Sequence, residues 1–194
     1  DLLQTIKLLE KAKNFLTQLA KEGKTLLLVV TKKPFALKTL ELCQKNNIPA
    51  ITTKWPAGLL TNFDYIIKNV KKLKTMRQEK EKGAWSKFVK HEQLKLKKEL
   101  GRLEKFYGGI ANLKKIPDAL FIVDIKKEKN AVEEAKRLGI PIVALVDTNC
   151  DPNKVDYPIP GNDDLEGSVN YFVNQIIEAY TQGLKLNNSP AGGF

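Results

Sequence analysis

Histidine and cysteine are scarce in this chain of 194 residues, which has one histidine, His91, and two cysteines, Cys43 and Cys150. The two cysteines are far apart and neither belongs to a CxxC pair, so the sequence predicts neither a disulfide framework nor a zinc site. We expect two reduced thiols, buried or half-buried. His91 lies between Lys90 and Glu92, where an exposed helix residue is favoured over a catalytic one.

Long apolar runs are also missing. No run reaches the roughly 18 residues that a membrane span needs. The sequence opens with Asp1-Leu2-Leu3 and has no basic n-region or small-residue cleavage site, so no signal peptide is predicted and the chain is expected to begin inside a longer protein. Its length suits one domain, or one domain with an insertion, and is enough to bury a sizeable core.

Acidic residues are most strongly outnumbered by basic ones in the middle of the chain. Residues 61–115 hold 16 Lys/Arg and 6 Asp/Glu, residues 1–60 hold 10 and 4, and residues 116–194 hold 7 and 12. The net charge of +11 therefore comes mainly from the middle block, which predicts a polyanionic partner at one face. Nucleic acid is favoured over an anionic membrane surface. Because lysine outnumbers arginine, phosphate contacts are favoured over the reading of base edges.

The two ends of the chain alternate buried strands with amphipathic helices. Continuous apolar runs at 25–30, 119–124 and 140–147 predict strands covered on both faces. The alternation predicts an α/β fold with a doubly wound parallel sheet of about five strands. Helices are expected at 2–21, 34–46, 127–138 and 165–182, a short strand at 50–53 and a proline-containing edge strand at 157–160. The predicted sheet core is Leu26, Leu28, Val30, Leu120, Ile122, Ile142, Ala144 and Val146.

The middle block does not follow this alternation. Its apolar residues recur at steps of three and four, which predicts two long helices pairing along a narrow coiled-coil seam, with a turn at 81–84. The expected organisation is an α/β domain made of 1–60 and 108–185, an inserted helical hairpin at 61–107 and a disordered tail at 186–194. The predicted seam is Phe63, Ile66, Val70, Leu73, Val89, Leu96, Leu100, Leu103 and Tyr107.

The lysines of this hairpin are the candidate contacts to the polyanion. Few acids stand among them to form i,i+4 pairs, so a partner that neutralises them is expected, with affinity gained from counterion release. The predicted binding residues are Lys54, Lys71, Lys72, Lys74, Arg77, Lys80, Lys87, Lys90, Lys95, Lys97, Lys98 and Arg102.

An enzyme of the Rossmann-like class is the alternative hypothesis. Asp124 and Asp147 end neighbouring predicted strands, while Asp163 and Asp164 precede the last helix. Carboxylates at that edge of a parallel sheet can bind Mg²⁺. Gly23-Lys24-Thr25 resembles the end of a phosphate-binding loop, but a helix precedes it and a strand follows, which is the reverse of the required order.

The favoured interpretation of these acids is structural. Asp147 and Asp151 are expected to organise a turn, and Asn162 or Asp163 to cap the last helix. No nucleophile–base pair is evident, so no catalytic residue, metal or cofactor is predicted.

One decapeptide is more specific than any of these patterns. Lys54-Trp55-Pro56-Ala57-Gly58-Leu59-Leu60-Thr61-Asn62-Phe63 resembles the signature of the small-ribosomal-subunit protein two family. Segments at 103–110, 117–124, 138–141, 147–152 and 159–164 resemble the same family in the same order. The resemblance covers essentially residues 1–183.

The resemblance implies a flavodoxin-like sheet with an inserted helical hairpin and a structural, non-enzymatic role in translation. It implies a place between the head and body of the small subunit, on its solvent side, with the hairpin on ribosomal RNA. The implied partners are this RNA and neighbouring small-subunit proteins, including in bacteria the large messenger-binding protein. The implied location is a ribosome in the bacterial cytoplasm, or in a plastid or mitochondrion. A free RNA-binding regulator with the same fold is a further possibility.

Two features depart from the family pattern. Family members carry an N-terminal stretch with Gly-His residues that contact RNA, and no residue here corresponds to it; Pro56-Ala57 also stands where Leu/Pro-Gly is usual. The expected junction between sheet and hairpin is Trp55, Gly58, Thr61 and Asn62. Trp55 is predicted to be a buried anchor, with base stacking as the alternative, and Thr61 or Asn62 is predicted to cap the first hairpin helix.

Overall fold

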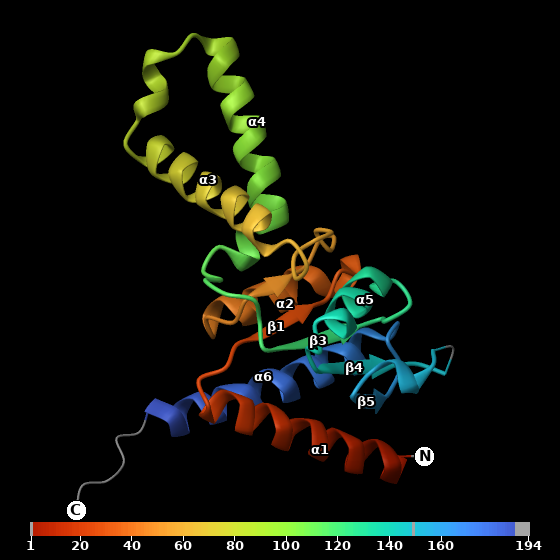
Figure 1. Cartoon of the computed structure of the whole chain (residues 1–194). Helices are drawn as coiled ribbons and strands as arrows, with labels where there is room; N and C mark the ends of the chain where they lie inside the picture. Colours follow the sequence, from red (N-terminus) through yellow and green to blue (C-terminus); the bar gives the residue numbers. More distant parts are fainter. Residues whose placement is uncertain (1, 149, 189–194) are drawn as a thin grey trace, which may run out of the picture.

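The computed structural model describes residues 2–148 and 150–188, which form a five-stranded parallel sheet with helices on both faces (Figure 1). The strand order is β2-β1-β3-β4-β5, which is the flavodoxin-like order. The fold class predicted from the sequence is confirmed. The strands are β1 (Leu26–Val29), β2 (Ala50–Ile51), β3 (Ala119–Val123), β4 (Ile142–Val146) and β5 (Tyr157–Pro160). The helices are α1 (Leu2–Lys21), α2 (Lys33–Lys45), α3 (Phe63–Glu81), α4 (Lys90–Tyr107), α5 (Lys129–Arg137) and α6 (Glu166–Asn188), with short 3-10 helices η1 (Ala84–Lys87), η2 (Gly108–Ile110) and η3 (Pro152–Lys154).

The sheet core consists of the predicted apolar runs. All eight predicted core residues are buried. Alternate residues of a strand face opposite sides, so Leu28 packs with α1, α2 and α6, while its neighbour Leu27 packs beneath α5 and the start of α3. The strand with two prolines, β5, lies at the edge of the sheet as predicted, where a residue without an N–H group is tolerated.

Helix ends follow local chemistry. Gly23, at φ +68°, ends α1. Its N–H donates to Ala20 O at 3.0 Å, and the N–H of Lys24 donates to Leu19 O at 3.1 Å, as in a Schellman motif. The predicted disordered tail is wrong at its start, because α6 continues to Asn188. The rest of that predicted tail lies outside the described residues.

The hairpin consists of two long helices, as predicted, but their packing differs from a seam along the whole pair. Figure 1 shows α3 and α4 rising from one end of the sheet and diverging toward the residues that join them. Val89 is 68% exposed, so its predicted seam position is wrong. Ile66 and Val70 belong to the cluster of the sheet core. The hairpin's own cluster contains Leu73, Met76, Trp85, Leu100 and Leu103.

The connection between the helices is longer than the predicted turn at 81–84. It includes η1, which carries Trp85 into the cluster between the helices, where the side chain is 5% exposed. The indole N–H of Trp85 donates to Glu79 Oε2 at 3.2 Å. Trp85 thus fills space that opens where the helices diverge. Within the described ranges, no helix combines the length and apolar character needed to cross a membrane.

Candidate nucleic-acid interface

The lysines predicted to bind a polyanion lie on the surface. Eleven of the twelve predicted residues are exposed, and Arg77 is half-buried. In the part of the chain that the structure describes, only Lys72 and Arg77 of this set lie within ion-pairing distance of a carboxylate. The other ten residues carry positive charges that form no ion pair with a carboxylate of the described residues.

Arg77 differs from the others because it joins the two hairpin helices. Its Nε and Nη2 donate to the two carboxylate oxygens of Glu104, each at 2.5 Å. This hydrogen-bonded pair raises the pKa of Arg77 and lowers the pKa of Glu104. Lys72 makes a similar cross-helix pair with Glu99. Both basic groups therefore hold α3 against α4, a role that the lysine pattern did not reveal.

The loop at residues 54–62, which leads into α3 and is called the signature loop below, is organised by one carboxylate on α5. Glu134 Oε1 accepts from Trp55 Nε1 at 3.0 Å and from Gly58 N at 2.8 Å, while Oε2 accepts from Leu60 N at 3.0 Å and Thr61 N at 3.2 Å. Burial alone would raise the pKa of Glu134, but these hydrogen bonds outweigh it and lower the pKa below its ordinary value. The carboxylate thus stays charged and holds these donors of the loop in one place.

This arrangement confirms one prediction for the loop and corrects another. Trp55 is 5% exposed, as predicted for an anchor. Asn62 is at the N-cap of α3, but its side chain makes no capping hydrogen bond. Thr61 Oγ1 donates to Glu134 at 3.3 Å instead. Gly58 is required here because its φ is +85° and a Cβ would lie 3.2 Å from Asn62 Cβ.

Sequence reasoning missed Glu134. It lies three residues after Ala131, which is fully buried on the inward face of α5. Residues three apart on a helix lie on the same face, so the spacing of Glu134 from Ala131 could have indicated that this carboxylate faces inward.

The acidic residues of the enzyme hypothesis lie close together, and three of them form ion pairs with the ammonium group of Lys32. Carboxylate oxygens of Asp147, Asp163 and Asp164 lie within 4.8 Å of one another. Lys32 Nζ lies 2.9 Å from Asp163, 2.7 Å from Asp164 and 3.1 Å from Asp124. Burial opposes the charge of Lys32, yet the hydrogen bonds to these carboxylates raise its pKa above the ordinary value. The ammonium group supplies the counter-charge that a cation would bring.

The expected turn and cap are present beside this cluster. Asp151 accepts from Asn153 N at 3.0 Å, and Asp147 accepts from Thr148 N at 2.7 Å. Asn162 accepts from Leu165 N at 2.9 Å, directly before α6. These contacts support the structural interpretation of the acids.

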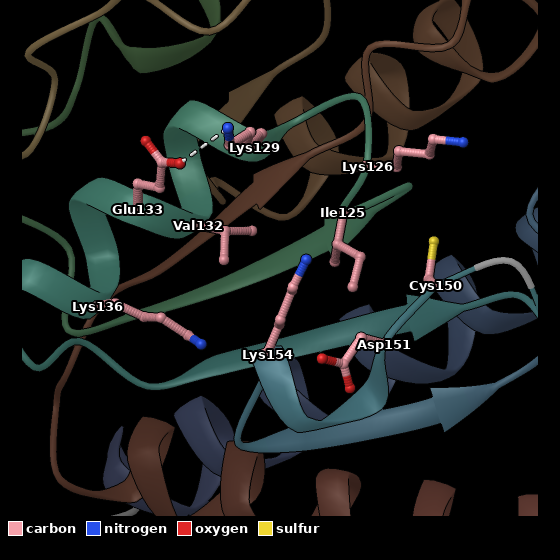
Figure 2. A pocket seen from close by; sticks show the side chains of 9 residues that line it. All are labelled: Ile125, Lys126, Lys129, Val132, Glu133, Lys136, Cys150, Asp151 and Lys154. Atoms are coloured by element: carbon pink, nitrogen blue, oxygen red, sulfur yellow. Dashed lines mark ion pairs between the residues drawn. The ribbon is translucent and has the colours of Figure 1, made fainter.

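A pocket of about 350 Å³ lies between α5 and η3 (Figure 2). Its lining bears on the enzyme hypothesis. Figure 2 shows Lys136 from α5 and Lys154 from η3 extending toward the same space, which Ile125 and Val132 also line. Cys150 also lines the pocket, but burial raises the pKa of its thiol. A nucleophilic cysteine needs the opposite shift. This pocket therefore offers positive charge without an activated nucleophile.

The fold and this surface define the chain as a flavodoxin-like α/β protein with a basic helical insertion. The family model described as Ribosomal protein S2 matches residues 1–183. The small ribosomal subunit protein uS2 of Campylobacter hominis is 42% identical over 188 residues, covering 97% of this chain and 70% of that protein. The proteins of the same name from Wolinella succinogenes and Nitratiruptor are 42% and 41% identical, covering 99% and 100% of this chain and 71% and 72% of those proteins.

The chain belongs to the ribosomal protein S2 family. The resemblance inferred from the six sequence segments is confirmed. The relatives are named as ribosomal proteins, which agrees with the prediction that the chain is not an enzyme. The alternative of a Mg²⁺-dependent enzyme finds no support among them.

Proposed function

We propose that this protein is a structural constituent of the small ribosomal subunit and holds ribosomal RNA with the hairpin formed by α3 and α4. Its location is then the ribosome of the bacterial cytoplasm, since the relatives described above come from bacteria. Its partners are small-subunit RNA and neighbouring small-subunit proteins, with the large messenger-binding protein of the subunit as the candidate implied by the family. Residues 61–107 act as an insertion in the α/β domain formed by 1–60 and 108–185.

The observation that carries this proposal is the exposure of unpaired lysines on two helices that project from the sheet. Lys71 and Lys74 on α3 and Lys95 and Lys98 on α4 are exposed, and no carboxylate of the described residues pairs with them. A surface of this kind gains free energy from RNA through counterion release. Contact through phosphates follows from the point charge of the lysine ammonium group, which does not read base edges bidentately.

The test is co-sedimentation with small subunits depleted of their own copy of the protein, at moderate salt. We expect the wild-type chain to sediment with the particles and the variant Lys71→Gln/Lys74→Gln/Lys95→Gln/Lys98→Gln to be largely lost from them. A matched control replaces Lys7, Lys21, Lys38 and Lys45, four exposed lysines of α1 and α2, and should sediment like the wild type. If both quadruple variants were lost equally from the particles, the hairpin lysines would contribute no more to binding than other exposed lysines, which would contradict the proposal.

A further inference from the structure

A second cavity, of about 460 Å³, lies where the hairpin meets the sheet. Its volume is within the roughly 300–1,000 Å³ range of ligand pockets. Residues from the signature loop, both hairpin helices and α5 contribute to its walls, so segments far apart in the sequence converge on it. The lining residues are Lys54, Trp55, Pro56, Ala57, Tyr65, Asn69, Arg102, Leu103, Phe106, Tyr107 and Asn130.

The cavity is rich in aromatic rings. Trp55 is buried, Phe106 and Tyr107 are half-buried, and Tyr65 is 59% exposed. Tyr65 lies in the first turn of α3 and Phe106 in the last turn of α4. Aromatic rings accessible at a pocket are the kind of platform on which an unstacked base lies.

The charge of the cavity is positive. Lys54 and Arg102 are the charged residues of its lining, and the lining contains no carboxylate. Both are exposed, and neither forms an ion pair with the described residues. The pocket of Figure 2 differs, because Glu133 and Asp151 stand among its lysines and its lining has no aromatic ring. The two cavities therefore suit different ligands, and only the one at the hairpin base combines rings with uncompensated positive charge.

Amide groups complete the lining. Asn69 Nδ2 donates to Tyr107 Oη at 3.2 Å, which leaves the carbonyl oxygen of Asn69 as an acceptor. Asn130, at the start of α5, is exposed and makes no side-chain hydrogen bond within the described ranges. Carboxamides pair with the edges of bases, to which they offer a donor and an acceptor side by side.

We propose that this cavity receives one unpaired nucleotide of the RNA that the hairpin binds. The base stacks on Tyr65 and Phe106, the adjoining phosphates lie against Lys54 and Arg102, and Asn69 and Asn130 contact the edge of the base. This inference rests on the proposed function for the presence of RNA. The cavity adds one contact with a base to an interface that otherwise contacts phosphates.

Glu134 is a positioning residue for this site. Its hydrogen bonds fix Trp55 and Gly58, and Trp55 forms part of the cavity wall. The cavity is thus preorganised in the free protein, which reduces the entropic cost of binding.

The test compares the affinity of the full chain and its variants for protein-free small-subunit RNA at fixed salt. Tyr65→Ala should raise Kd roughly 5- to 150-fold, the range expected for the loss of one stacked base. Tyr65→Phe keeps the ring and should bind like the wild type. Tyr171→Ala serves as the control, since Tyr171 is 54% exposed on α6 and does not line the cavity. Because no phosphate contact is removed, Tyr65→Ala should leave the salt dependence of binding unchanged.

Chemical probing of the RNA with dimethyl sulfate identifies the base. The wild type and Tyr65→Phe should protect an unpaired adenine or cytosine, or a short single-stranded run that contains it, and Tyr65→Ala should restore its reactivity. The proposal is overturned if Tyr65→Ala binds like the wild type while the hairpin lysine variant still loses affinity, an outcome that leaves the proposed function intact. It is also overturned if Tyr65→Ala affects only co-sedimentation with complete subunits, because the cavity would then hold a protein segment.

Discussion

The carboxylate of Glu134 accepts a hydrogen bond from the indole N–H of Trp55 at 3.0 Å, across a separation of 79 residues in the chain. The same carboxylate accepts from three backbone N–H groups of the loop that leads into α3. The junction between the sheet and the hairpin thus depends on one side chain of α5.

Removing this carboxylate should destabilise the protein. Glu134→Ala leaves a buried indole N–H and several backbone donors without their acceptor, and we expect a loss of about 2–4 kcal/mol in the free energy of unfolding. The neighbouring Glu133 is exposed, and its ion-pair partner among the described residues is the exposed Lys129. Glu133→Ala should change stability by less than about 0.5 kcal/mol in the same denaturant titration. Similar losses in both variants would contradict the account.

The lowered pKa of Glu134 makes its contribution dependent on pH. A carboxyl whose pKa is lower in the folded than in the unfolded state stabilises the fold above its ordinary value near 4.5, and this stabilisation is lost as pH falls through the folded value. The stability difference between wild type and Glu134→Gln should therefore be largest near neutral pH and shrink below pH 4.5. A difference that stays constant from neutral pH into the acid range would show that the charge is not involved.

Lys32 should be more important for stability than its exposed neighbour Lys33. Its side chain is 17% exposed and the Asp163 side chain 5% exposed, so Lys32→Met leaves a buried carboxylate unpaired at a cost of about 3–5 kcal/mol. Lys33→Met should be nearly neutral. Adding Asp163→Asn to Lys32→Met should recover part of the loss, measured as non-additivity in a double-mutant cycle. Strict additivity would mean that the pair does not interact.

The sheet strands should respond as a packed core does. Leu28→Ala and Ile122→Ala, at fully buried positions on opposite faces of the sheet, should each cost about 2–5 kcal/mol. Leu37→Ala, at a position that is 69% exposed, should cost little. Losses below about 0.5 kcal/mol at both core positions would be incompatible with the observed burial.

The strands and helices of the sheet were predictable because each is encoded by a local pattern. A run such as 119–123 is apolar at every position, Gly23 marks the end of a helix, and Pro158 marks an edge strand. The contacts that organise the candidate site join residues far apart in the chain, so no local pattern encodes them. Glu134 with Trp55, and Lys32 with Asp163, are of this kind.

The hairpin was predictable only in part. Its helices follow from apolar steps of three and four, but the same steps do not say which apolar residues face the partner helix and which face the sheet. Val70 fits the period of a seam and packs with the sheet core. Trp85 breaks the helical period and yet fills the space between the helices. Tertiary packing decided both positions.

The central claim is that the hairpin lysines hold RNA through phosphates. The most direct measurement is the salt dependence of binding to a small-subunit RNA fragment by the wild type, by Lys71→Gln/Lys74→Gln/Lys95→Gln/Lys98→Gln, and by the control with Lys7, Lys21, Lys38 and Lys45 changed to Gln. Each contacted phosphate contributes roughly 0.7–0.9 to the slope of log K against log salt. The hairpin variant should therefore have a slope flatter by about two to four units, with similar weakening for all RNA sequences. The control should keep the wild-type slope. Equal slopes for all three proteins would contradict the account.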